Sequence, residues 1–167
     1  MQIKKMTGFI QLHHDQMKVS SRIKMHINST LYLALFLSFF SSYTYADISV
    51  VVSNDNNNAL NKFEIKKIFL GQRTFFPDGS QAIPVIQEKA SETAQQFITL
   101  FLNRSLQQYR SHWARLIFTG KGYPPEEIFS DAEAIDRIIN DPTIISYIQS
   151  SSLTEDVKEV LRIEYVF

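Results

Sequence analysis

The stretch from Ile83 to Leu102 constrains the fold most, because a strand signal, a turn and a helix start follow one another directly. An apolar run, Ile83 to Ile86, leads into a polar turn, and Ser91 then stands at a helix N-cap position. The apolar residues of one helix face follow at Phe97, Leu100 and Phe101. This order of elements directs backbone N–H groups and the positive end of a helix dipole at one place. Two interpretations follow: Ser91 helps to hold a small anion, or it only caps its helix.

Residues 1–46 are predicted to be a signal peptide. A basic segment ending at Lys24 precedes the apolar run Leu31 to Phe40, which is too short to span a bilayer comfortably. Thr44 and Ala46 place small residues at the −3 and −1 positions, so we expect cleavage after Ala46 and export of residues 47–167 to the periplasm, without membrane insertion. Met17 and Met25 are alternative start residues. The other interpretation is a buried or membrane-anchoring helix.

Cysteine and histidine usage narrows the chemistry. The chain has no cysteine, which excludes a disulfide, a thiolate metal site and a lipid-anchored cysteine. Only His112 lies outside the predicted leader, so one mature chain cannot form a two-histidine metal site, and a Ser-His-Asp triad would have to use His112. We therefore expect no cofactor, no metal and no enzymatic activity.

Charge bears on the partner. Removal of residues 1–46 leaves 12 basic and 16 acidic residues, a formal net charge of −4. A mildly acidic chain without an evident basic stripe argues against nucleic acid as a partner. The segment Gly120-Lys121-Gly122 does not change this view, because it lacks the flanking glycine and hydroxyl residue of a phosphate-binding P-loop.

The remaining chain alternates strand and helix signals. Apolar or alternating runs predict strands at 48–52, 83–86, 144–148 and 160–167. Helical spacing predicts helices at 60–69, ended by Gly71, and after the caps Ser91, Ser105 and Ser130 or Asp131. This order is typical of an α/β fold, with a mostly parallel sheet flanked by helices.

For the helices after Ser105 and Ser130, the sequence also predicts which residues face the core and which face solvent. The helix after Ser105 should bury the stripe formed by Leu106, Tyr109, Trp113, Leu116 and Ile117, with His112 partly exposed beside it. The helix after Ser130 should turn Ala132, Ile135, Ile138 and Ile139 inward. Its acidic residues Glu133 and Asp136, with Glu126 and Glu127 before it, are interpreted as a solvated face.

Several short motifs, in this order along residues 47–167, resemble the phosphate ABC transporter substrate-binding proteins. They are I-F-L-G (68–71), F-P-D-G-S (76–80), I-P-V-I (83–86), Ser91 with Phe97, Trp113, F-T-G-K-G-Y-P-P (118–125) and the 140–147 segment. The resemblance is to the short, single-domain branch of the type II periplasmic binding protein superfamily. It implies a chain reduced to about one lobe, since full-length members close two lobes on phosphate.

The resemblance also implies binding residues. A Gly-Ser-Gly-Thr turn holds the anion in the family, and here Ser91 and Thr93 match its hydroxyl residues, whereas Ala90 and Glu92 replace both glycines. A hydroxyl residue after the first strand is matched by Ser53. The basic side chain that completes the family's site would be Arg73, Lys89 or Lys121.

Three functions come into consideration for such a chain. The first is a periplasmic solute-binding protein for phosphate or a similar oxyanion, associated with an ABC importer. The second is a periplasmic protein-interaction or sensory module that keeps the scaffold with a degenerate anion site, which the altered turn and the short chain favour. An enzyme, the third, has no support from a nucleophile motif or a metal-ligand spacing.

Overall fold

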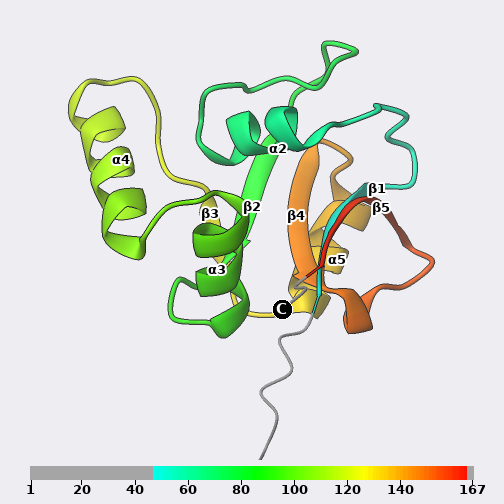
Figure 1. Ribbon diagram of the computed structural model, residues 1–167. Coiled ribbons are helices and arrows are strands. Elements are labelled where there is room, and N and C mark those ends of the chain that lie inside the picture. Colours follow the sequence, from blue (N-terminus) through cyan, green and yellow to red (C-terminus); the bar gives the residue numbers. More distant parts are fainter. Residues whose placement is uncertain (1–46, 165–167) are drawn as a thin grey trace, which may run out of the picture. The chain divides into compact units, whose positions relative to one another are not determined.

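A computed structural model describes residues 47–164, so the predicted signal peptide and residues 165–167 lie outside the described part. The described chain alternates strands and helices (Figure 1). The strands are β1 (Ile48–Ser53), β2 (Ile83–Gln87), β3 (Glu126–Ile128), β4 (Ile144–Gln149) and β5 (Val157–Ile163). The helices are α2 (Lys62–Phe69), α3 (Glu92–Gln96), the π-helical turn η1 (Phe97–Phe101), α4 (Leu106–Phe118), α5 (Asp131–Asn140) and the 3-10 turn η2 (Ser150–Ser152).

The five strands form one mixed sheet in the order β3-β2-β4-β1-β5. Strand β2 runs parallel to β3 and β4, whereas β1 runs antiparallel to β4 and β5. Helices lie in the connections from β2 to β3 and from β3 to β4, as crossovers between parallel strands require. The predicted α/β fold is confirmed, and its sheet combines the expected parallel neighbours with antiparallel ones.

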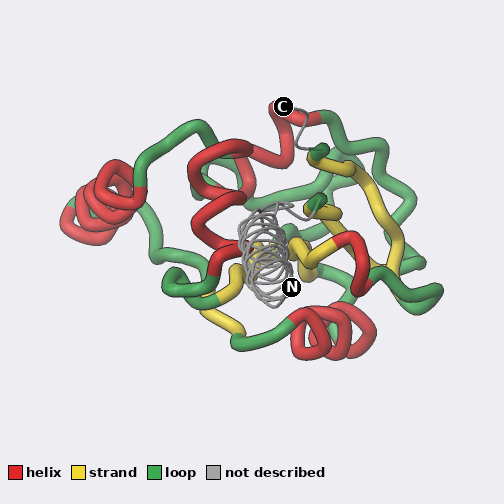
Figure 2. Tube along the Cα trace, turned by 60° about the horizontal axis from the view of Figure 1, so that its bottom comes forward, coloured by secondary structure: helices red, strands yellow, loops and turns green. Residues whose placement is uncertain are grey.

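Each face of the sheet has its own hydrophobic core, because successive side chains of a strand point to opposite faces. From β1, Val50 and Val52 belong to the core that also takes residues from α2, α3, η1 and α4. Val51 belongs to the second core, to which α5 contributes Ala134 and Ile138. Figure 2 shows helices on both sides of the strands, with α4 again at one side of the sheet as in Figure 1.

The predicted helix boundaries are confirmed by their caps. The hydroxyl groups of Ser91, Ser105 and Ser130 each accept a hydrogen bond from a backbone N–H in the first turn of their helices. Gly71 follows α2 with a φ of +66°, in the left-handed region that favours glycine. A Cβ at this position would lie 2.6 Å from Cη2 of Trp113, so the glycine also allows α4 to pack closely.

Leu100, predicted to face the core, is 52% exposed. The reason is the π-helical turn η1, which places an extra residue in the turn and shifts the register of the helix face. Phe97, Ile98 and Phe101 are buried as a result.

The inward faces of α4 and α5 also differ from the prediction. The buried face of α4 is formed by Tyr109, His112 and Trp113, which rotates Ile117 to 48% exposure. In α5 the buried residues are Ala134 and Ile138. Ile139, one residue further, is 54% exposed, and Ala132 is exposed as well.

The prediction for His112 was wrong, and the strand at residues 126–128 was not predicted. His112 is buried, because its Nε2 lies 2.8 Å from the carbonyl oxygen of Leu70, directly after α2, and satisfies it there. Residues 126–128 form the edge strand β3, parallel to β2. This strand begins with two glutamates, so its three residues do not show the hydrophobic pattern by which a strand is recognised in a sequence. Within residues 47–164, no helix is long and apolar enough to cross a membrane.

Candidate functional site

The candidate site lies at the carboxyl ends of the parallel strands β2, β3 and β4, where α3 begins (Figure 1). In open α/β sheets, ligands bind at this edge because the loops after parallel strands meet there. Ser91 caps α3 at this position, and its hydroxyl accepts a hydrogen bond of 3.1 Å from the N–H of Ala94. Thr93, in the same turn, is 6% exposed. The structure thus brings Ser91 and Thr93 together at the sheet edge where an α/β site is expected.

A chain of hydrogen bonds links these two residues through the strand ends. The Ser91 hydroxyl donates to Oε1 of Gln87 at 3.3 Å, and Nε2 of Gln87 donates to Oδ1 of Asp131. The other carboxylate oxygen, Oδ2, accepts from the N–H of Gln149 at 3.2 Å, while Nε2 of Gln149 donates to the Thr93 hydroxyl at 3.3 Å. The protein's own carboxylate therefore joins the polar groups of this edge.

Lys89 lies at the same edge, but its ammonium group is already paired with a carboxylate. Its Nζ forms an ion pair with Oε1 of Glu127, and its N–H lies 3.4 Å from Oε2 of the same carboxylate. The hydrogen bond from Lys89 lowers the pKa of Glu127, so this carboxylate stays ionised at neutral pH. An anion here would have to share Lys89 with Glu127.

Two backbone donors remain for a ligand. The N–H groups of Glu92 and Thr93, in the first turn of α3, have no hydrogen-bond acceptor within residues 47–164. The side chain of Glu92 is held along the helix, since Nε2 of Gln96 donates to its Oε1 at 3.1 Å. Although Glu92 replaces a glycine of the family's turn, its carboxylate does not accept hydrogen bonds from the N–H groups of Glu92 and Thr93.

Ser53, Arg73 and Lys121 lie away from this edge. Ser53 ends β1, whose other end pairs with Gln149, so it lies about 16 Å along the strand from the Ser91 edge. Its hydroxyl accepts from the N–H of Asp55 at 3.2 Å. No single site can therefore contain both Ser53 and Ser91.

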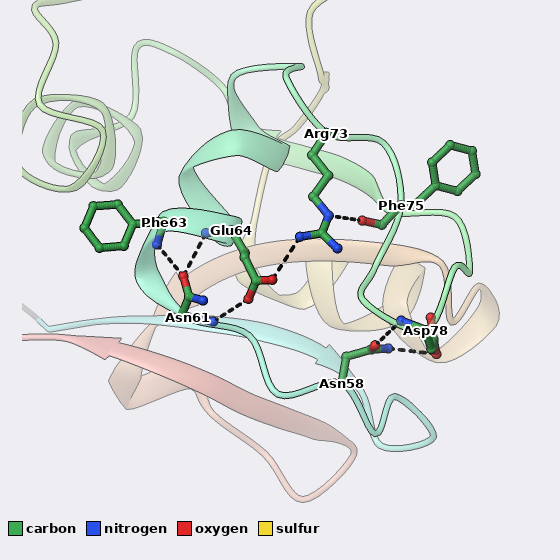
Figure 3. Close-up of polar contacts among 7 residues, drawn as sticks. All are labelled: Asn58, Asn61, Phe63, Glu64, Arg73, Phe75 and Asp78. Atoms are coloured by element: carbon green, nitrogen blue, oxygen red, sulfur yellow. Dashed lines mark hydrogen bonds and ion pairs between the residues drawn. The ribbon is translucent and has the colours of Figure 1, made fainter.

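Arg73 and Lys121 line a cavity of about 230 Å³ beside Ile83 and Pro84, the first residues of β2 and hence the opposite edge of the sheet. Figure 3 shows how Arg73 is used: Nε donates to the carbonyl of Phe75 at 2.7 Å, and Nη1 donates to Oε1 of Glu64 at 2.9 Å. Arg73 thus ties the loop after α2 to the first turn of that helix, rather than serving the α3 turn.

Residues that sequence reasoning missed complete the edge. Gln87, Asp131 and Gln149 each follow or end an apolar run, and strand-end polar residues are the signal that could have identified them.

Two tyrosine hydroxyls, those of Tyr109 and Tyr147, are buried without a hydrogen-bond partner in the described chain. Burial raises the pKa of Tyr109 to about 12 and raises that of Tyr147 still further, so both rings stay neutral.

No protein-family model matches the sequence, and no curated protein matches it either. Solved structures do match. An ABC-type phosphate transport receptor from Vibrio cholerae is similar over 71% of this chain and 47% of its own, with 18% identity and a TM-score of 0.55. A Clostridium perfringens protein assigned as a phosphate ABC transporter substrate-binding protein, solved with bound phosphate, matches 69% of this chain and 45% of its own, with 17% identity and a TM-score of 0.52.

The chain thus spans less than half the length of the receptors it matches. At such low identity the likeness concerns the fold. The described chain shares its α/β fold with a part of these phosphate receptors.

Proposed function

We propose that the protein is an exported solute-binding protein that takes phosphate or a similar oxyanion at the first turn of α3 and serves an ABC importer. The observation that carries this proposal is the pair of uncapped N–H groups of Glu92 and Thr93 beside the hydroxyls of Ser91 and Thr93. Such donors, with the positive end of a helix behind them, suit a tetrahedral oxyanion. The fold shared with phosphate receptors supports the same assignment.

Each residue has a defined role in the proposed site. The hydroxyls of Ser91 and Thr93 and the two N–H groups donate to the anion, and Lys89 supplies positive charge once it turns from Glu127. Arg73 and Lys121, on the opposite edge, and Ser53, about 16 Å away along β1, take no part.

Binding of a dianion should be weak, because carboxylates already occupy the surroundings. Asp131 accepts hydrogen bonds from Gln87 and Gln149, and Glu127 is paired with Lys89. Removing the charge of Asp131 should therefore strengthen phosphate binding more than removing that of Glu92, which is held along α3.

Calorimetry of the purified protein with phosphate, sulfate and molybdate tests the site. Asp131→Asn should tighten phosphate binding at least tenfold, about 1.4 kcal/mol. Asp136→Asn is the matched control, since Asp136 is an exposed carboxylate of the same helix that bonds only Asn140 there. Ser91→Ala in the Asp131→Asn background should weaken binding by about 1–3 kcal/mol, because it removes a donor to a charged acceptor.

The glycine replacements provide a second series. Ala90→Gly combined with Glu92→Gly restores the bare backbone of the family's turn and should also tighten phosphate binding by at least tenfold. Equal affinity in the wild type and in both series would show that neither the carboxylates nor the turn limits binding.

The second candidate is a protein-interaction or sensory module on the same scaffold. The observation in its favour is that the polar groups of the edge are largely satisfied by Asp131 and Glu127, while the chain spans less than half of the receptors' length. Failure of every variant to bind phosphate, sulfate or molybdate would favour this candidate and exclude the first.

Export is part of the proposal. The mature protein should begin at Asp47 and reside in the periplasm, which intact-mass measurement on protein from its native host can check. A mass that includes Leu31 to Phe40 would indicate an anchored protein.

A further inference from the structure

A wide pocket between α2 and α4 is lined by charges of one sign. Its volume is about 750 Å³, and the charged side chains that line it are Lys66 from α2, Arg104 from the loop before α4 and Arg115 from α4. No Asp or Glu lines this pocket. The pocket lies at the far end of α3 and η1 from Ser91, about 15 Å along ten helical residues.

The local excess of positive charge contrasts with the formal net charge of −4 of residues 47–167. Between Thr93 and Pro125 the sequence has no acidic residue but includes Arg104, Arg110 and Arg115. The expected absence of a basic stripe therefore does not hold for this region. Since like charges repel, gathering them costs free energy unless a counter-charge is present.

None of the three charged residues that line the pocket, Lys66, Arg104 and Arg115, forms an ion pair with a carboxylate in the described chain. The ion pairs within residues 47–164 involve Arg73, Lys89, Arg137 and Arg162. Lys66 and Arg104 are nonetheless half-buried, unlike ordinary solvated surface cations. Burial and the neighbouring Lys62 lower the pKa of Lys66, which an anion in the pocket would reverse.

The walls of the pocket add neutral polar groups and a shaped backbone. Ser111 and Gln107 line it, and so does His112, whose Nδ1 has no hydrogen-bond partner within residues 47–164 while Nε2 is bound to Leu70. Asn103 turns the chain at its rim with a φ of +56°, a conformation that non-glycine residues adopt at some cost. Lys66 is also positioned by the ring of Phe101, 5.3 Å from its Nζ.

We propose that this pocket is a second anion site, for a phosphoryl group with at least two negative charges, as in pyrophosphate or a phosphorylated headgroup. The arginines and Lys66 supply charge-assisted hydrogen bonds, and Ser111 and Gln107 contribute neutral ones. The site does not depend on the α3 turn, because it uses none of its residues.

Calorimetry of the purified protein with pyrophosphate and with inorganic phosphate tests this site. Lys66→Gln, Arg104→Gln and Arg115→Gln should each weaken pyrophosphate binding about tenfold or more, as expected for a hydrogen bond to a charged group. Arg110→Gln is the matched control, an exposed arginine of α4 outside the pocket, and should change affinity less than about twofold. Loss of pyrophosphate binding in the three pocket variants but not in Arg110→Gln assigns this binding to the pocket and not to the proposed α3 site.

Sedimentation with phosphatidylcholine vesicles, with and without phosphatidic acid, whose phosphomonoester can carry two negative charges, identifies the source of the phosphoryl group. Binding of pyrophosphate alone indicates a soluble ligand, and pocket-dependent binding to phosphatidic acid vesicles alone indicates a lipid headgroup. The proposal is overturned if neither probe binds, or if Arg110→Gln weakens binding as much as the pocket variants do.

Discussion

Replacement of Trp113 by alanine tests the packing of α4 against the rest of the chain. Trp113 is 4% exposed, and its ring contacts the backbone of Gly71 closely enough that a Cβ there would be 2.6 Å away. Tyr109 and His112 lie edge-on to its ring, at centroid distances of 6.2 and 5.4 Å. The side chain thus joins α4 to the end of α2.

The expected magnitude follows from two opposing effects. Loss of a buried tryptophan typically costs about 3–5 kcal/mol, through lost apolar burial and the cavity left behind. Nε1 of Trp113 is buried without an acceptor, so its removal also relieves a desolvated donor worth about 1–3 kcal/mol. Taking the middle of each range, a net loss of about 2 kcal/mol is expected, which for a domain of this size lowers Tm by about 8 °C.

Thermal unfolding followed by circular dichroism measures this change. Phe118→Ala is the matched control, because Phe118 is an aromatic residue of the same helix that is 92% exposed. It should shift Tm by no more than about 2 °C. A Tm for Trp113→Ala within about 3 °C of the wild type would refute the packing of α4 described here.

Two further predictions concern the first turn of α2 and the acid limit of stability. Asn61→Ala should lower stability by about 1 kcal/mol in urea unfolding, because Oδ1 of Asn61 accepts from the N–H groups of Phe63 and Glu64 (Figure 3); an unchanged midpoint would contradict this. The urea midpoint should also fall as the pH drops below about 4.5. The backbone N–H of Asn61 lowers the folded-state pKa of Glu64, and the hydrogen bond from Lys89 lowers that of Glu127. As the pH falls, the unfolded chain therefore binds protons at these two carboxylates before the folded chain does, and their contribution to stability is lost. Constant stability down to about pH 3 would show that these carboxylates do not stabilise the fold.

Much of the local structure could be predicted from the sequence, because the interactions that form it are local. Ser105 caps α4 through the N–H of Gln108, only three residues away. Gly71 ends α2 because a left-handed residue there favours glycine. The run of β-branched residues at β1 forms a strand buried on both faces, because such side chains pack well on a pleated surface.

The candidate site could be predicted only in part. Ser91 and Thr93 were identified because the helix start that places them is visible in the sequence. The contribution of Asp131 was not, because its carboxylate reaches Gln87, 44 residues earlier in the chain, through the adjacency of β2 and β3. Ser53 was assigned to the site although it lies at the other edge of the sheet.

The sequence by itself determined where the helices are capped and where β1, β2 and β4 lie, since caps, turns and hydrophobic spacing act over a few residues. Only the tertiary structure decided the direction of each strand, and with it the edge to which each polar residue was carried. Because β1 runs antiparallel to β4, Ser53 at the end of β1 was placed away from the α3 turn, whereas the parallel β2 and β4 brought Thr93 and Gln149 together. Strand pairing depends on contacts between residues distant in sequence, which no local pattern records.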